Sequence, residues 1–477
     1  MSFVLGKTVN PAKVFIEHKT NVTGRWDPFF YRPELVALEK RVRKASSHRV
    51  RQFARSMAGG ATPSTKEAET HYTESEDGVP FIRVQNLSTT GRLDLADCKR
   101  ITRSTHEGLL KRSRLSGGEL LVKITGVGRM AVASVVPEDF EGNINQHIAA
   151  IKTDDIKTSE TLAAYLNLDI AERLASRRST GGTRPALDYP ALLSIPVIFD
   201  SRIPKLMNAA VQRHQERVEE AKRLLSTIDD VLLDQLGIPR QPEPPNTLKS
   251  RIFKRDFSSV SGKRIDPAAN WKRLSLDGGK FLLRRLRDVA SINPITRFPK
   301  LELGTPVSFV PMDAVSDVFG EIAERQTRPI EEAGSYTPFQ NGDVIWAKIT
   351  PCMENGKAAV ADGLAEGVGY GSTEFHVFRR RTNELLPHYL HHLLRLKTVR
   401  EHARRNFTGS SGHQRVDENF FYRMEIPFPS KKIQERIAEK AEATKCQARK
   451  LFADARTDLE KAKRDIEALI LGKEGGE

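Results

Sequence analysis

Two long stretches of this chain carry apolar and small residues at the spacing of a coiled-coil helix. In residues 203–236 these positions recur at alternating steps of four and three, without glycine and without strand-like alternation. The positions are Met207, Val211, His214, Val218, Ala221, Leu225, Ile228 and Leu232. Residues 430–471 repeat the pattern with one skip, at Ile437, Ala441, Thr444, Ala448, Leu451, Ala455, Leu459, Ala462, Ile466 and Leu469. The pattern predicts two long helices that pack against each other or, alternatively, against two separate partner helices.

Each predicted long helix follows a region of mixed character. Short strand-like runs, such as residues 79–84 and 131–136, are separated by turns rich in Gly, Asn and Asp. A helical stretch comes after these runs, at residues 162–176 in the first region and 387–404 in the second. Both regions are therefore predicted to be mixed domains of strands and helices.

The two mixed regions repeat each other. The matching strings, in chain order, are Val22–Pro28 with Val260–Pro267, Gly118–Thr125 with Gly342–Thr350, Thr180–Arg184 with Thr408–Arg415, and Ile195–Pro196 with Ile426–Pro427. A repeat this long indicates two homologous domains, because solenoids and propellers repeat over much shorter distances. Two similar modules in tandem suggest a protein that contacts two similar targets at once.

The charge of the chain indicates what such a target is. The 477 residues include 76 Lys and Arg against 61 Asp and Glu, which gives a net charge of +15. A positive field attracts polyanions, and nucleic acid is the commonest of these. No stretch has the apolar length of a membrane span, the N-terminus lacks the apolar run of a signal peptide, and the three cysteines argue against a disulfide scaffold. We expect a cytoplasmic protein without membrane association.

Catalytic patterns are weak throughout the sequence. Asp27–Phe30 is similar to the Asp-Pro-Pro-Phe loop of adenine methyltransferases, but residues 266–269 in the second copy lack the aromatic side chains that hold a flipped base. Glu138, Asp155 and Lys157 have a loose nuclease-like spacing that could hold Mg²⁺, which the second copy does not repeat. The twelve histidines form no zinc-binding pattern. We therefore expect a binding protein with no catalytic residues, no metal site and no cofactor.

Several long strings match a known family. They are Gly78–Leu87, Gly142–Gln146 and Thr183–Tyr189 in the first copy, and Ala347–Lys357, Gly371–His376, Ile426–Pro429 and Gln434–Ile437 in the second. In these strings the chain resembles the specificity subunit of type I restriction–modification systems, from about residue 20 onward. The resemblance implies an α+β fold with two target-recognition domains separated by two helices in an antiparallel coiled coil. It also implies a non-catalytic adaptor that binds double-stranded DNA and recruits two adenine-methyltransferase subunits and ATP-dependent restriction subunits.

The repeat and the resemblance together define the expected domains. They are an N-terminal tail (1–20), target-recognition domain 1 (21–202), a central conserved helix (203–237), a Pro-rich linker (238–259), target-recognition domain 2 (260–429) and a C-terminal conserved helix (430–472). We expect Val218, Leu225 and Ile228 to be buried between the helices. The central helix would span roughly 50 Å, somewhat more than one turn of B-DNA, so the target is expected to be bipartite with unread bases between its halves.

Residue type and loop position together indicate the DNA-contacting residues. Base reading requires Arg, Lys, Asn, Gln, Ser or Thr presented from loops. In the first copy the candidates are Arg83, Gln85, Asn86, Lys123, Arg129, Asn145, Gln146 and Arg184. In the second copy they are Lys348, Asn355, Lys357, Thr373, His376, Ser410, Ser411, Gln414 and Arg415. For each residue, a role in capping a turn is the alternative to DNA contact.

The function predicted from the sequence is thus a DNA-specificity subunit of a phage-defence restriction system. Residues 126–130 and 351–357 differ between the copies, so the two half-sites are expected to differ in sequence. One alternative is a specificity-like DNA-binding subunit of another phage-defence complex. The other is a stand-alone DNA nuclease that uses Asp155 and Lys157.

Overall fold

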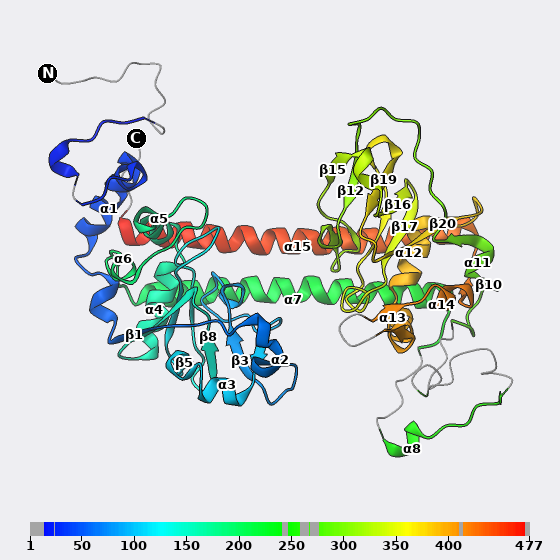
Figure 1. The fold of residues 1–477 in the computed structure, drawn as a ribbon, viewed down its shortest axis with the longest axis horizontal. Helices are drawn as coiled ribbons and strands as arrows, with labels where there is room; N and C mark the ends of the chain where they lie inside the picture. Colours follow the sequence, from blue (N-terminus) through cyan, green and yellow to red (C-terminus); the bar gives the residue numbers. More distant parts are fainter. Residues whose placement is uncertain are drawn as a thin grey trace. The chain divides into compact units, whose positions relative to one another are not determined.

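A computed structural model gives the structure of the chain. It describes residues 14–22, 24–240, 247–257, 267, 276–409 and 414–472. Residues 260–266 of the repeated string, part of the predicted Pro-rich linker, and the candidates Ser410 and Ser411 lie outside these ranges. The chain divides into two compact units: unit 1 runs up to Arg217 and resumes at Ala453, and unit 2 extends from Val218 to Phe452 (Figure 1).

The strands and helices of the first copy form most of unit 1. The strands are β1 (Ser56–Gly59), β2 (Tyr72–Thr73), β3 (Val79–Ile82), β4 (Lys99–Ile101), β5 (Arg114–Leu115), β6 (Leu120–Lys123), β7 (Ala133–Val135), β8 (Gly142–Ile144) and β9 (Ile148–Lys152). The helices are α1 (Pro33–Ala45), α2 (Ala68–His71), α3 (Arg103–Glu107), α4 (Ile156–Leu166), α5 (Asp169–Arg178), α6 (Tyr189–Leu193) and the start of α7 (Arg202–Leu236). The strand-like runs at 79–84 and 131–136 are confirmed as β3 and β7.

The second copy forms unit 2. Its strands are β10 (Leu283–Arg285), β11 (Ala290–Ile292), β12 (Pro306–Val310), β13 (Val315–Ser316), β14 (Glu321–Ile322), β15 (Gln326–Pro329), β16 (Thr337–Gln340), β17 (Asp343–Ala347), β18 (Ala358–Ala361), β19 (Val368–Gly371), β20 (Phe375–Arg380), β21 (Phe407–Thr408), β22 (Arg415–Val416) and β23 (Glu425–Pro427). Its helices are α8 (Leu248–Arg251), α11 (Leu286–Val289), α12 (Pro387–Arg395), α13 (Lys397–Arg405), α14 (Asn419–Tyr422) and α15 (Lys431–Leu471), which ends in unit 1.

The sheets of the two units have the same topology. One sheet has the order β1-β9-β6-β7 in unit 1 and β11-β20-β17-β18 in unit 2, with antiparallel neighbours throughout. The other contains β4-β3-β8-β5 in unit 1 and β15-β12-β19-β16 in unit 2, and its central pair is parallel in both. The first helix after these strands packs on equivalent strands, α4 on β6 and β7 and α12 on β17 and β18. The predicted α+β fold with two similar domains is thereby confirmed.

Each helical stretch predicted after the strands is two helices joined at a buried leucine. Leu168 separates α4 from α5, and Leu396 separates α12 from α13; both have non-helical ψ angles, 156° and 133°, and are at most 1% exposed. Before Leu168, the Asn167 side chain accepts from the Ala133 amide at 3.1 Å and donates to its carbonyl at 2.7 Å. Burial of the leucine and this side-chain pairing favour a break that helix propensity alone does not reveal.

A tyrosine on the first helix of each pair forms a hydrogen bond with the segment that precedes a long helix, α7 in the first copy and α15 in the second. The Tyr165 hydroxyl donates to the Pro196 carbonyl at 3.1 Å, and the Tyr389 hydroxyl donates to the Pro427 carbonyl at 2.8 Å. Both tyrosines are fully buried. Since Pro196 and Pro427 belong to the repeated Ile-Pro string, the same contact is made in both copies.

The long helices α7 and α15 each contribute to both units. In unit 1 the start of α7 shares a hydrophobic core with the end of α15, including Met207, Val211 and Ile466. In unit 2 the end of α7 shares a core with the start of α15, including Leu232 and Ile437. The two helices therefore pair in opposite directions, as expected. Among the helices that the structure describes, none is both long and apolar enough to cross a membrane.

The seam between the long helices differs from the expected one in two places. Leu469 is 44% exposed and Ile470 is 8% exposed, because after Ile466 the buried stripe advances by four residues rather than three. Val218, Leu225 and Ile228 were expected to be buried and are half-buried. These three residues belong to none of the hydrophobic cores of the two units.

A carboxylate from a long helix caps the second helix of each pair. In unit 1, Glu467 of α15 accepts from the Ile170 amide in the first turn of α5 at 2.9 Å. In unit 2, Asp229 of α7 accepts from the Lys397 amide at the start of α13 at 2.8 Å. Burial raises the pKa of both carboxyl groups. In each copy the second helix of the pair is thus capped by the long helix that follows the other copy in the sequence.

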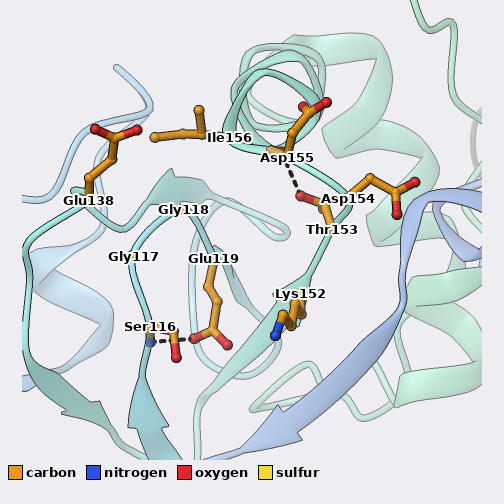
Figure 2. Close-up of a pocket in the computed structure, with 10 residues that line it drawn as sticks. All are labelled: Ser116, Gly117, Gly118, Glu119, Glu138, Lys152, Thr153, Asp154, Asp155 and Ile156. Atoms are coloured by element: carbon orange, nitrogen blue, oxygen red, sulfur yellow. Dashed lines mark hydrogen bonds between the residues drawn. The ribbon is translucent and has the colours of Figure 1, made fainter.

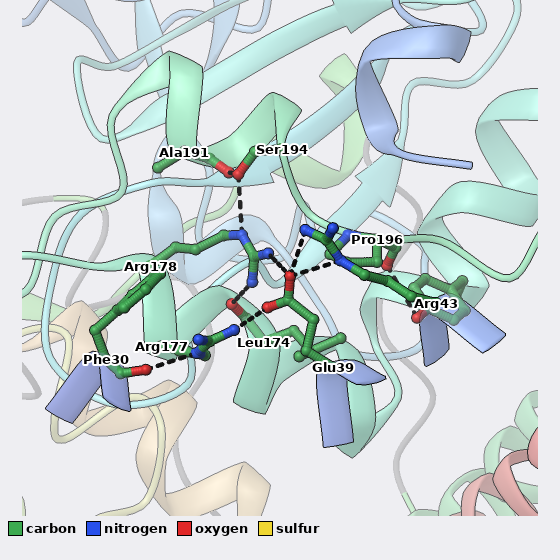
Figure 3. Close-up of polar contacts among 10 residues, drawn as sticks. Phe30, Glu39, Arg43, Leu174, Arg177, Arg178, Ala191, Ser194 and Pro196 are labelled. Atoms are coloured by element: carbon green, nitrogen blue, oxygen red, sulfur yellow. Dashed lines mark hydrogen bonds and ion pairs between the residues drawn. The ribbon is translucent and has the colours of Figure 1, made fainter. Parts of the chain in front are cut away.

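Helix α1 packs against α5, and a buried group of charged side chains joins the two helices (Figure 3). Figure 3 shows Glu39 between Arg43, Arg177 and Arg178, with Arg178 Nη2 donating to Glu39 at 2.8 Å and Arg43 Nη2 lying 2.6 Å from it. Burial raises the pKa of Glu39, but the attraction of Arg178 and Arg177 outweighs this effect, so the pKa lies below its ordinary value. Glu39 is therefore a buried anion that depends on its arginine partners.

Candidate nucleic-acid interface

Four loops of the first copy meet at one edge of the domain. They are residues 83–87, 124–132, 145–147 and 180–187, here called loop cluster 1. Backbone hydrogen bonds join them: the Asn145 amide donates to Ile82 O at 3.1 Å, Ile124 donates to His147 O at 2.9 Å, and Leu187 donates to Ile124 O at 2.8 Å. The predicted residues of the first copy, scattered along the sequence, are brought together by these bonds.

The second copy assembles the equivalent loops. They are residues 348–357, 372–374 and 414–416, here called loop cluster 2. The Lys348 amide donates to Glu374 O at 2.9 Å, Thr350 donates to Gln414 O at 3.1 Å, and Val416 donates to Lys348 O at 2.9 Å. In both copies the loop after the central strand, β6 or β17, lies between the other loops.

The predicted residues differ in how far they reach the surface. In loop cluster 1, Gln85, Gln146 and Arg184 are exposed, Arg83 and Arg129 are half-buried, and Asn86 and Asn145 are buried, as is Lys123 at the end of β6. In loop cluster 2, Asn355 and Thr373 are exposed and Lys348, Lys357, Gln414 and Arg415 are half-buried, while His376 in the adjoining strand β20 is buried. The exposed and half-buried residues form the surface that a ligand can meet without rearrangement of the loops.

Asparagine side chains shape the loops of the first copy from within. Asn86 is 2% exposed, accepts from the Arg83 amide at 2.9 Å and donates to the Asp94 carbonyl at 2.9 Å. Asn145, also buried, accepts from the amide of His147 at 3.2 Å. These bonds fix turns, which is the alternative role that the sequence left open for such residues.

Two predicted lysines hold loop backbone rather than reach outward. Lys123 is 5% exposed, and its ammonium group donates to the Val127 carbonyl at 2.7 Å. Burial lowers the pKa of Lys123. Lys357 donates to the carbonyls of Met312 and Val315, each at 2.9 Å. A buried ammonium that satisfies main-chain carbonyls stabilises the loop that carries them.

Two predicted arginines are paired with carboxylates. Arg129 donates to Asp169 at 2.6 Å and to the Asn167 carbonyl at 2.7 Å. Arg415 binds both oxygens of Glu374, at 2.8 and 2.7 Å, and its hydrogen bonds lower the pKa of Glu374. Sequence reasoning missed Glu374, because carboxylates are not expected beside DNA. Its place within the family-like string 371–376 was the available signal.

Two histidines at the loops have lowered pKa values. His376 donates from Nε2 to the Val416 carbonyl at 2.8 Å, and its Nδ1 lies 3.1 Å from Asn293 Nδ2. Burial lowers the pKa of His376. His147 also has a lowered pKa, first because of burial and second because of the nearby positive charge of Arg184. Positive charge at the surface of loop cluster 1 therefore comes from arginine rather than histidine.

The acidic residues of the nuclease alternative lie elsewhere in unit 1, around a pocket of about 400 Å³ (Figure 2). Glu138 and Asp155 both line it. However, Asp155 accepts from the Thr158 amide at 2.7 Å and caps α4, while Lys157 is exposed and is not a lining residue. Within the described ranges, no group of three or more His, Cys, Asp or Glu residues is arranged to hold a metal ion.

Comparisons with known proteins match the second copy most directly. Residues 281–443 match the family model described as the type I restriction modification DNA specificity domain. Over 230 residues, 45% of the chain, the sequence is 34% identical to the type I restriction enzyme EcoEI specificity subunit and 33% identical to the EcoAI specificity subunit, both of Escherichia coli. The chain spans about two fifths of the length of these relatives, 38% in each case.

The chain also has a distant similarity to solved structures. One, titled for complex assembly and conformational transition of the type I R-M system, is 15% identical with a TM-score of 0.40, covering 89% of this chain and 96% of that one. The HsdS subunit from Thermoanaerobacter tengcongensis is 14% identical with a TM-score of 0.33, at the same coverage. The family model and the curated relatives confirm the resemblance to type I specificity subunits.

Proposed function

We propose, from this resemblance and the paired loops, that the chain is the DNA-binding specificity subunit of a cytoplasmic type I restriction–modification complex. The observation that carries the proposal is the construction of one loop cluster twice, at equivalent edges of two equivalent domains. A net charge of +15 favours association of such a chain with a polyanion. Each loop cluster contacts one half of a bipartite target in double-stranded DNA.

Surface residues of the loop clusters contact the DNA. Glutamine and asparagine side chains suit the adenine edge in the major groove, which assigns base reading to Gln85, Gln146 and Asn355. Arg184 and Lys348 supply positive charge for phosphate contacts. The buried members of the predicted set, such as Lys123 and His376, hold the loops in position.

The two halves of the target differ in sequence. The loop after the central strand presents Val127 in loop cluster 1 and Asn355 in loop cluster 2, and these side chains have different chemistry. Helix α7 contains 35 residues. At 1.5 Å per residue it spans roughly 50 Å, which suits two half-sites slightly more than one DNA turn apart. The helices thereby set the number of unread bases.

The chain acts without chemistry of its own. It recruits two adenine-methyltransferase subunits and ATP-dependent restriction subunits, and these partners bind the methyl donor and ATP. Among the residues expected of a nuclease centre, Asp155 caps α4, and Lys157 is exposed and does not line the pocket. Incubation of the purified chain with plasmid and Mg²⁺ should leave the plasmid intact, and cleavage without partners would favour the nuclease alternative.

Methylome sequencing tests the proposal directly. The full chain is expressed with the genes beside its own in a host that lacks restriction systems, and N6-methyladenine is mapped across the genome. We expect one bipartite motif with unlike halves. Neighbouring genes for a methyltransferase and a helicase–nuclease support the type I assignment, and other neighbours favour another phage-defence complex.

Two matched substitutions separate the halves. Gln146→Ala should relax the motif in one half, and Asn355→Ala should relax it in the other, because each residue is exposed on a different loop cluster. The expected cost at each affected base pair is about 1–3 kcal/mol. Gln212→Ala, at an exposed position of α7, is the control and should leave both halves unchanged. Simultaneous relaxation of both halves by either loop variant would contradict independent reading.

A further inference from the structure

An apolar side chain stands at the tip of the central loop in loop cluster 1. Val127 is 77% exposed, and it lies between Gly126 and Gly128, whose φ angles are 123° and 81°. Such positive φ values favour glycine and turn the chain sharply on each side of the valine. A single exposed valine is ordinary by itself. The contacts that hold Val127 in place distinguish it from an ordinary surface residue.

Three hydrogen-bonded contacts fix the tip from beneath. The buried ammonium group of Lys123 donates to the carbonyl of Val127 itself at 2.7 Å. The Gly126 amide donates to the Pro185 carbonyl at 3.1 Å, which ties the loop to residues 180–187. On the other side Arg129 donates to Asp169 at 2.6 Å. A loop held at its tip and on both sides loses little conformational entropy when it binds.

The backbone below the tip is also constrained. Ala131 has a φ of 54° although it carries a side chain, and it is completely buried. Non-glycine residues in this region cost energy and persist only where the surroundings require them. The loop after β6 is thus built to present one apolar group in one orientation.

The surroundings of the tip indicate the size of its ligand. The other exposed candidates of loop cluster 1 are Gln85, Gln146 and Arg184, which are polar or charged. Polar and charged side chains on the same loop cluster disfavour a broad apolar partner and leave room for contact with a single small apolar group. On DNA that group is the C5-methyl of thymine, which projects into the major groove beside hydrogen-bonding atoms.

We propose that Val127 is a specificity-determining residue that contacts the methyl group of one thymine in the half-site read by loop cluster 1. This inference rests on the proposed function, since it names the base that the same site reads. Loop cluster 2 has no equivalent preference for a methyl group, because its exposed tip residue is the polar Asn355.

The test removes the methyl group from the DNA and from the protein in turn. The full chain first selects its motif from a pool of randomised duplexes. Each thymine of the motif is then replaced by deoxyuridine, which pairs identically but lacks the methyl group. We expect one position to lose about 4-fold in affinity, the value of one buried methyl-sized group. Val127→Gly should lose a similar factor on the thymine duplex and show no further loss on the deoxyuridine duplex.

Two further variants make the result specific. Val127→Thr keeps one methyl group and the shape of valine, so it should retain part of the sensitivity to deoxyuridine even if the glycine variant folds poorly. Asn355→Ala, in the other loop cluster, should retain all of it. A selected motif without any deoxyuridine-sensitive position, or equal sensitivity in wild type and Val127→Gly, overturns the inference and leaves the proposed function standing. Failure to select any motif overturns both.

Discussion

Loop clusters 1 and 2 present unlike tips in a similar way. Lys123 holds the backbone of the first tip, and Arg395 donates to the Gly356 carbonyl of the second at 3.0 Å. In each case a cation beneath the loop satisfies main-chain carbonyls, whatever side chain stands above. The outward side chain is Val127 in one and Asn355 in the other. The residue that supports each loop is therefore distinct from the residue at its tip, so the tip residue can change while the sheets beneath the loop stay the same.

The helices next to these loops differ in what covers them. At the end of α5, Arg177 and Arg178 are buried around Glu39 of α1. At the end of α13, Arg404 is exposed, and its Nε lies 3.9 Å from Glu354. The first copy therefore has a buried charge group at the end of this helix, whereas the second has a more exposed ion pair there.

The largest expected effect comes from removing the buried carboxylate of the first copy. Glu39→Ala leaves two buried arginines without their carboxylate and should reduce the free energy of unfolding of unit 1 by about 3–5 kcal/mol. Glu354→Ala removes a more exposed partner and should cost at most about 1 kcal/mol in unit 2. Hydrogen exchange read peptide by peptide, along a denaturant series, measures each unit separately. Equal losses in the two variants would contradict the assigned difference in burial.

A smaller effect should be equal in the two copies. Tyr165→Phe and Tyr389→Phe each remove a buried hydroxyl and leave a proline carbonyl without its hydrogen bond, at Pro196 and Pro427. Each substitution should cost about 1–3 kcal/mol in its own unit. Denaturant unfolding of both variants provides the measurement. A large effect in one copy and none in the other would show that the equivalent hydrogen bonds do not contribute equally to the free energy of unfolding.

The smallest expected effect concerns pH. Burial raises the pKa of Glu467 and of Asp229, so their contribution to stability is present below the unfolded pKa of about 4 and is lost as pH rises through the raised folded pKa. Glu467→Gln and Asp229→Asn lack this loss. The free energy of unfolding of each variant, measured relative to wild type, should therefore increase as pH rises from 4 to 7. A difference that does not vary with pH would contradict the raised pKa values.

The long helices and the repeat could be predicted from the sequence because both are periodic. Alternating steps of four and three placed α7 within one residue at its start, and the repeated strings indicated that the two domains are alike. The break at Leu168 could not be predicted, since it depends on Asn167 meeting Ala133, a residue far away in the sequence. Contacts across such distances leave no local pattern.

The candidate interface was predicted by residue type, and residue type does not reveal depth. Lys123 and Gln146 are both polar residues in loops, yet the first is buried beneath a tip and the second is exposed. Val127 was overlooked for the opposite reason, because an apolar residue does not suggest contact with DNA. Its significance depends on the anchors around it, and those come from three separate segments of the chain.

The contribution of α15 to unit 1 has a consequence for synthesis on the ribosome. Domains usually fold in the order in which they emerge, with the N-terminal one first. Here the core of unit 1 includes Leu459, Ile466 and Ile470, which leave the ribosome after the whole of unit 2. Unit 2 is one continuous segment, from Val218 to Phe452. Unit 1 therefore begins to emerge before unit 2 but is completed after it, and a ribosome that stops before residue 459 releases a unit 1 whose core lacks these residues.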